Sequence, residues 1–163
     1  MTKFTVTKTG TPLDPSLYDW NENTKTFSTK ENHLVLDFGH LDGINFKTGS
    51  DCFFDTGAHC TFDTGAHCTF KTGPDCTFNT WAECTFNTGS DCVFNTGSNC
   101  VVVRRDIFEV IQLMDETNHI QLNGYRIQGH KVIEPEVLHT IILDGKEVKL
   151  NKDVYDKVKT LLG

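Results

Sequence analysis

The chain has 163 residues, a formal net charge of −7 and 37% hydrophobic residues. This length fits one domain, or one domain with caps. The negative charge disfavours a general binder of nucleic acid or of anionic membranes, and no stretch of the sequence approaches the apolar length of a membrane span.

Residues 1–33 are expected to form an irregular cap. The alternation of polar and apolar residues over 3–8 indicates an edge strand. Residues 10–24 carry Tyr18 and Trp20 in a stretch without a clear period. We expect these two rings to cover the open end of the structure that follows, because an exposed strand edge invites aggregation.

Residues 46–100 repeat the octad Phe-x-Thr-Gly-x-x-Cys-x seven times. Glycine follows each threonine of the octad except at Trp81. The repeat includes every cysteine of the chain, namely Cys52, Cys60, Cys68, Cys76, Cys84, Cys92 and Cys100. A fixed short period of this kind is the mark of a repeat architecture.

Each octad is predicted to be a short strand followed by a turn. Cys, Phe and Thr are two residues apart, so their side chains share one face of an extended segment, and Gly supplies the turn. Short strands cannot bury a face alone, but stacked coils can. We therefore predict an all-β fold, a β-solenoid with interior columns of Phe and Cys over residues 34–112. Two octads per coil are favoured, with three octads per coil or three chains wound together as alternatives.

A small β-rich module ending in one α-helix is expected over residues 113–163. Asn123-Gly124 between the strands 119–122 and 125–127 predicts a two-residue hairpin, and Asp144-Gly145 predicts another. The helix is expected from apolar residues at helical spacing, with Asn151 or Asp153 as its cap. The apolar residues are Val154, Val158, Leu161 and Leu162.

The cysteines are expected to be free, buried thiols. Their number is odd and their spacing regular, unlike a disulfide framework, and no Cys-x-x-Cys pair suited to zinc occurs. His59 and His67 directly precede cysteines, but adjacent strand residues face opposite ways. No metal or other cofactor is predicted.

The sequence does not indicate an enzyme. Residues 55–57 and 63–65 spell Asp-Thr-Gly, the aspartic-protease signature, whose chemistry needs two carboxylates sharing a proton. Other octads carry Asn or Lys in place of this Asp, so the motif is interpreted as a variant of the repeat. We therefore expect no catalytic residues.

Arg104-Arg105 follows directly on the last octad. This pair could bind a phosphate or an acidic partner. A salt bridge to Asp106 or Glu109 is the favoured interpretation.

The octad, with the segment 100–110 that follows it, resembles uncharacterised proteins of tailed bacteriophages and related bacterial loci. Residues 142–150 with the following helix resemble a common phage module. The repeat is also loosely similar to pentapeptide-repeat proteins, whose rods act by presenting a surface and in some cases mimic DNA. The five-residue consensus is absent, so that likeness concerns shape and charge alone. The phage resemblance implies a location in the cytoplasm of the host cell, or in the virion if the protein is structural.

The expected function is a non-enzymatic acidic scaffold that binds a protein partner, in one form an inhibitor of a host defence or DNA-handling protein. Direct contact with nucleic acid or a membrane is not expected. The candidate contacts are the outward acidic residues Asp51, Asp55, Asp63, Asp75, Glu83 and Asp91.

Two alternatives remain open at the level of sequence. One is a structural virion or fibre component that forms a homo-oligomer. The other is ice binding through outward threonines of the octads, although the second outward column is Asp, Lys or Asn. These threonines are Thr61, Thr69, Thr77 and Thr85.

Overall fold

A computed structural model describes residues 3–39, 41–143 and 145–162. The chain divides into two compact units, residues 1–133 and residues 134–163. Each unit is described by itself.

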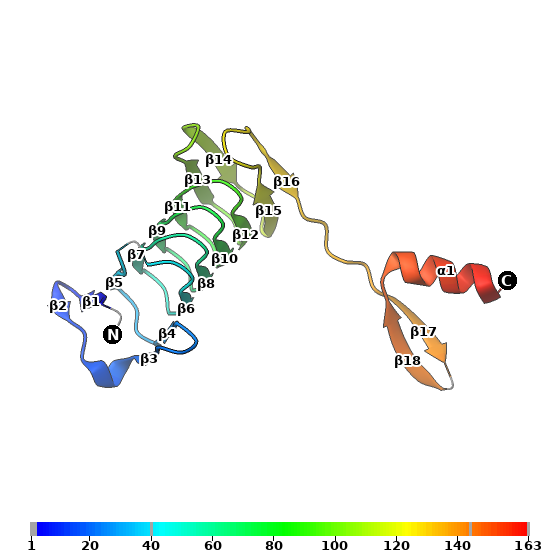
Figure 1. The fold of residues 1–163 in the computed structure, drawn as a ribbon, viewed down its shortest axis with the longest axis horizontal. Helices are drawn as coiled ribbons and strands as arrows, with labels where there is room; N and C mark the ends of the chain where they lie inside the picture. Colours follow the sequence, from blue (N-terminus) through cyan, green and yellow to red (C-terminus); the bar gives the residue numbers. More distant parts are fainter. Residues whose placement is uncertain (1–2, 40, 144, 163) are drawn as a thin grey trace. The chain divides into compact units, whose positions relative to one another are not determined.

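The first unit is a β-solenoid in which consecutive strands from β4 to β13 alternate between two sheets (Figure 1). Sheet A has the order β14-β13-β11-β9-β7-β5-β1-β2, and sheet B has the order β16-β15-β12-β10-β8-β6-β4-β3. The strands of sheet A are β1 (Thr5–Lys8), β2 (Thr11–Pro12), β5 (Leu34–Asp37), β7 (Phe53–Asp55), β9 (Thr69–Lys71), β11 (Thr85–Thr88), β13 (Cys100–Arg104) and β14 (Glu109–Leu113). The strands of sheet B are β3 (Asp19–Asn21), β4 (Thr26–Ser28), β6 (Asn45–Lys47), β8 (Thr61–Asp63), β10 (Thr77–Asn79), β12 (Val93–Thr96), β15 (Asn118–Leu122) and β16 (His130–Val132).

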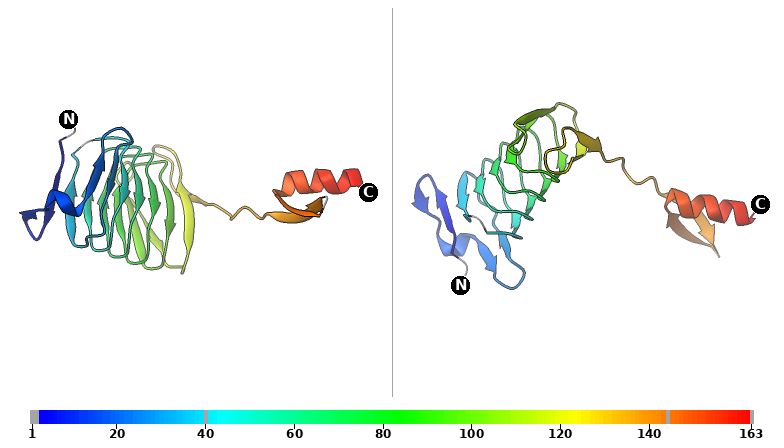
Figure 2. Two further views of the ribbon diagram at one scale, coloured as in Figure 1. Left: turned by 90° about the horizontal axis from the view of Figure 1, so that it is seen from below. Right: turned by 45° about the horizontal axis from the view of Figure 1, so that its top comes forward.

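Two octads make one coil, as predicted. Phe62 in β8 pairs in parallel with Phe78 in β10, and Phe70 in β9 pairs with Phe86 in β11. The partners are one coil apart, so like residues lie above one another. Figure 2 shows the resulting stack of coils. The parallel stack already includes β4, whose Phe27 is the register partner of Phe46.

The core consists of two columns of phenylalanine rings, one from each sheet. Within sheet B the rings of Phe62 and Phe78 stack with centroids 5.0 Å apart and an angle of 5° between their planes. Between the sheets, Phe70 meets Phe78 edge-to-face at 5.2 Å and 72°. Both arrangements suit the ring quadrupole. The octad phenylalanines are fully buried, and Cys and most of the inward threonines are buried beside them.

The turns of the repeat differ from the sequence expectation in one respect. The left-handed residue is the one that precedes each cysteine, for example Asp75 with φ 58° and Glu83 with φ 61°. The octad glycine is needed for another reason. A Cβ on Gly73 would lie 2.8 Å from the backbone nitrogen of Ala58 in the preceding coil. The octad position therefore requires glycine because the turns of adjacent coils stack closely, and not because the backbone there has a positive φ.

Aromatic rings close the N-terminal end of the stack. Phe4 stacks on Phe38 at 4.4 Å, and Tyr18, which follows the 3-10 helix η1 (Pro15–Leu17), stacks on Phe27 at 5.2 Å. Trp20 packs against Phe38 at 5.9 Å. Tyr18 and Trp20 thus cover the first coil, as the sequence suggested.

The C-terminal end of the stack is closed by antiparallel strands. β14 pairs with β13, and β15 pairs with β12. The predicted two-residue hairpin at Asn123-Gly124 is wrong, because β15 pairs with β16 and the connection spans residues 123–129. This longer loop packs on the buried Arg104, as described below.

The second unit is a β-hairpin followed by a helix. β17 (His139–Leu143) pairs with β18 (Lys146–Leu150), and α1 (Lys152–Leu162) follows. The predicted turn residue Asp144 lies outside the described residues. Asn151 caps the helix, since its side-chain oxygen accepts a hydrogen bond from the Val154 amide at 3.0 Å. His139 stacks on Tyr155 at 4.3 Å and joins the hairpin to the helix.

Candidate functional site

The six predicted contact residues are exposed or half-buried, but they lie on four different surfaces of the solenoid. Asp51 and Glu83 belong to the turns that lead from sheet B to sheet A, which we call the first edge. Asp75 and Asp91 belong to the opposite turns, from sheet A to sheet B, which we call the second edge. Asp55 points out from sheet A, and Asp63 points out from sheet B.

The first edge alternates histidine and acid from coil to coil. His33 Nδ1 lies 3.9 Å from Asp51 Oδ2, and His67 Nδ1 lies 3.1 Å from Glu83 Oε2. These side chains are well exposed, so each pair contributes little to stability. The second edge brings two of the predicted acids, Asp75 and Asp91, to adjacent coils, and the guanidinium of Arg105 also reaches this edge, where it donates to the Thr72 carbonyl. At ordinary strand spacing, adjacent coils place the two acids about 5 Å apart at the backbone.

The backbone explains much of the residue choice on both edges. Asn, Asp and His tolerate the left-handed conformation better than most residues, and they fill this position in most coils. Glu83 departs from that preference. The residues in this conformation before a cysteine are Asp51, His59, His67, Asp75, Glu83, Asp91 and Asn99.

The two acids on the sheet faces are already engaged by neighbouring coils. Lys71 Nζ lies 2.6 Å from Asp55 Oδ2. The side-chain amide of Asn79 donates to Asp63 Oδ1 at 3.2 Å, and the amide of Asn95 donates to Asn79 at 3.2 Å. These ladders make the faces regular. Asp37 in β5 is the register partner of Asp55 and points out from the same sheet, but Asp55 and Asp63 themselves point out from different sheets. The two Asp-Thr-Gly motifs therefore lie on separate faces.

The outward threonines form one column on each sheet. Thr69 pairs with Thr85 on sheet A, and Thr61 pairs with Thr77 on sheet B. Phe53 interrupts the column on sheet A, where it pairs with Thr69. Ice binding by these columns remains a prediction that a measurement of thermal hysteresis would test.

The cysteines form two columns of buried free thiols, one inside each edge. The hydrogen bonds between stacked thiols act in opposite directions on their two partners. The pKa of Cys52 and of Cys60 is raised, first by the hydrogen bond with Cys68 or Cys76 and then by burial. The pKa of Cys68 and of Cys92 is lowered, first by the hydrogen bond with Cys52 or Cys76, which outweighs burial. A raised pKa favours the neutral thiol over the thiolate, which is the nucleophile and the metal ligand. Across residues 3–39, 41–143 and 145–162, no group of three or more His, Cys, Asp or Glu side chains could hold a metal ion.

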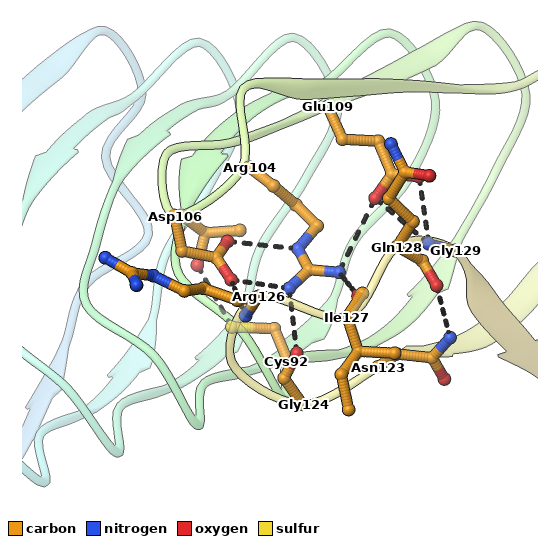
Figure 3. Close-up of polar contacts among 11 residues, drawn as sticks. Cys92, Arg104, Asp106, Glu109, Asn123, Gly124, Arg126, Ile127, Gln128 and Gly129 are labelled. Carbon is orange, nitrogen blue, oxygen red and sulfur yellow. Dashed lines mark hydrogen bonds and ion pairs between the residues drawn. The ribbon is translucent and has the colours of Figure 1, made fainter.

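Arg104 is the centre of a buried polar cluster at the last coil (Figure 3). Its guanidinium contacts both carboxylates that the sequence suggested, at 2.7 Å from Asp106 Oδ2 and 3.5 Å from Glu109 Oε2. It also donates to the carbonyl oxygens of Gly124 at 3.2 Å and Ile127 at 2.7 Å. The two carboxylates in turn accept hydrogen bonds from backbone amides of the 123–129 loop. The cluster fastens the loop over the end of the stack.

Trp81 is a surface feature whose role the sequence did not suggest. It was visible only as the one interruption of the octad glycines. In the structure its side chain is 73% exposed on the first edge. It lines a groove together with residues of the N-terminal cap.

Comparisons of the chain with protein-family models, with curated proteins and with solved structures find no match in any of the three. In the described part of the chain, no helix is both long and apolar enough to span a membrane.

Proposed function

We propose that the chain is a non-enzymatic scaffold whose solenoid binds a basic protein partner through its charged edges. The observation that supports this proposal most directly is the position of Asp75 and Asp91 on adjacent coils of the second edge. The parallel ladder and the stacked phenylalanine core hold these carboxylates at a fixed spacing. Because the scaffold is already ordered, it loses little conformational entropy when a partner binds there. A small charged surface needs such preorganisation to give useful affinity.

The acidic surface favours partners that themselves bind nucleic acid. Complementary charge raises association rates and suppresses like-charged partners. A phage-encoded inhibitor of a host defence or DNA-handling protein is one form of this function. The resemblance of the repeat to phage proteins supports that form.

Affinity capture from bacterial lysate tests the proposal. The immobilised full chain should retain a basic protein at low salt and release it as the ionic strength rises, since exposed charges are screened. The double variant Asp75→Asn/Asp91→Asn should lose the protein. Asparagine keeps the left-handed backbone conformation, so the variant should fold.

Asp55→Asn is the matched control, because Asp55 is engaged by Lys71 on sheet A. It should retain the partner. If the wild-type chain captures no protein at low salt, or if the double variant captures the same protein equally well, the proposal is wrong.

A second candidate is a homo-oligomeric structural component, favoured by the second unit. This unit has 30 residues by the division of the chain at residue 133, and it contains no cysteine. Units shorter than about 40 residues usually need a disulfide, a metal or oligomerisation. Ile142 is 72% exposed and Leu161 is 84% exposed, so apolar surface is available for a second copy.

In an antiparallel pair of α1 helices from two copies, Asp153 in the first turn of one helix would lie near Lys159 in the last turn of the other. Mass photometry of the full chain should then show an oligomer, and Leu161→Lys should dissociate it. Met114→Lys, at an exposed residue of the first unit, should not. A monomeric wild-type chain would exclude this candidate.

A further inference from the structure

A groove of about 760 Å³ lies between the N-terminal cap and the first edge. Tyr18, directly before β3, lines one part of it, and Trp81, two residues after the end of β10, lines another. Between them the groove is lined at the ends of β4, β6 and β8, which are consecutive neighbours in sheet B. At about 4.8 Å per strand, this series of five strands extends over about 19 Å. The groove is thus long enough for a linear ligand of several units.

The fold itself does not require a tryptophan at position 81. The same position of the neighbouring coils is Gly65 or Gly97. A Cβ on Gly65 would lie 2.1 Å from the Ser50 hydroxyl oxygen, and one on Gly97 would lie 2.9 Å from the Ala82 nitrogen. Glycine is therefore the residue that the stacking favours. A large, exposed aromatic ring at this position points to a role on the surface.

Apart from Leu17, the remaining lining of the groove is mostly polar and nearly balanced in charge. Two lysines and three acids contribute to it, together with hydroxyl groups of the cap and of the coil turns. This mixture does not select a strongly charged ligand, but it offers many hydrogen-bond donors and acceptors. The charged residues are Asp19, Lys30, Glu31, Lys47 and Asp63.

The backbone amides beneath the groove already donate hydrogen bonds to carbonyl groups of the solenoid. The amide of Thr48 donates to the Asp63 carbonyl at 3.1 Å, the amide of Thr64 to the Asn79 carbonyl at 3.0 Å, and the amide of Gly65 to the Gly49 carbonyl at 3.2 Å. These amides are unavailable to a peptide that adds as a strand, because such binding depends on free main-chain groups. The ligand must instead be recognised by side chains.

We propose that this groove binds a linear, uncharged oligosaccharide. The apolar face of one sugar ring packs flat on the Trp81 indole. A second ring farther along contacts the exposed part of Tyr18, whose ring also stacks on Phe27. Aromatic side chains combine a large apolar surface with a polar edge. The sugar hydroxyls donate to Asp63 and accept from Lys47, whose two strands are register neighbours.

The test is binding of the full chain to an immobilised panel of linear neutral glycans, followed by titration with soluble hexasaccharides of β-1,4-linked glucose and N-acetylglucosamine. The wild-type chain should bind at least one linear glycan of the panel or a hexasaccharide. Trp81→Gly should weaken that binding at least tenfold. Binding should also shift the wild-type tryptophan emission to shorter wavelength, and Trp81→Gly should abolish the shift although Trp20 remains.

Trp81→Gly restores the residue of the repeat, so loss of folding is not expected. Tyr125→Ala is the matched control, since it removes an exposed ring at the other end of the solenoid, and it should bind as the wild type does. The proposal is overturned if no glycan of the panel and neither hexasaccharide binds at millimolar concentration, or if Trp81→Gly binds as tightly as the wild type. Failure of the protein-capture experiment would leave this result unaffected, because Asp75 and Asp91 lie on the opposite edge.

Discussion

Arg104 in β13 is the register partner of Thr88 in β11, one coil below it. Both side chains point into the solenoid and both are fully buried. The threonine hydroxyl bonds within the repeat, to the Gly73 carbonyl at 3.0 Å. The arginine instead bonds to the loop that closes the stack. The same inward position therefore continues the repeat in one coil, where it is Thr88, and ends the repeat in the next coil, where it is Arg104.

Replacing Arg104 by methionine should destabilise the protein by about 3–5 kcal/mol, because it leaves the buried Asp106 carboxylate and the half-buried Glu109 carboxylate without their cation. Urea unfolding followed by circular dichroism measures the change. Arg126→Ala in the same loop should change the free energy of unfolding by less than about 0.5 kcal/mol, since that side chain is exposed. Similar losses in the two variants would contradict the role given to Arg104.

The acid stability of the protein should depend on Asp106. Burial raises the pKa of this carboxyl, but the Arg126 amide and Arg104 outweigh burial and hold the pKa below its usual 3.8. Because the pKa is lower in the folded state, this contribution to stability is complete above the unfolded pKa and is lost as the pH falls through the folded value. The free energy of unfolding should therefore decline below about pH 4. The decline should be smaller in Asp106→Asn. An equal decline in both proteins would show that other groups dominate.

Truncation in the phenylalanine core should cost far more than truncation on the face. Phe70 stacks on Phe54 and on Phe86, each at 4.9 Å, so Phe70→Ala should lose about 3–5 kcal/mol as a core truncation. Thr69→Ala, on the exposed side of the same strand, should cost less than about 0.5 kcal/mol. Denaturant titration of the two variants gives the comparison, and equal effects would mean that the faces are reversed.

The two kinds of turn position should respond in opposite ways to small substitutions. Gly73→Ala should destabilise by about 1–3 kcal/mol, because its methyl group meets the backbone of Ala58. Glu83→Gly should be neutral or stabilising by up to about 1 kcal/mol, because it relieves a left-handed residue. Melting temperatures of both variants test this assignment. Destabilisation by Glu83→Gly would indicate that its contact with His67 matters more than the backbone.

The cysteine thiols should not react with thiol reagents in the folded protein. All the cysteines are buried, with at most 2% of each residue exposed. An aromatic disulfide reagent at about pH 8 should label none of them in buffer, because attack requires an accessible thiolate. It should label all seven after unfolding in urea. Rapid labelling of any thiol in the native chain would show that the stack opens locally.

The side chains that point into each coil could be predicted from the sequence. A two-residue alternation places Cys76, Phe78 and Thr80 on one side of a strand, and the eightfold period leaves stacked coils as the way to bury them. The aromatic cap and the pairing of Arg104 with Asp106 and Glu109 were also foreseen. These features depend on local patterns or on residues close in sequence.

The tertiary structure decided which surface residues become neighbours. Asp51 and Asp75 both precede a cysteine, yet they lie on opposite edges because two octads close one coil. Three octads per coil would have grouped them differently. With two, the phenylalanine columns of the two sheets meet edge-to-face in the interior. The loop 123–129 likewise departs from its local hairpin signal because the buried charge of Arg104 recruits its carbonyls. Local periodicity thus determines which side chains point inward. Closure of the core and burial of the Arg104 charge determine which surface residues and loops become neighbours.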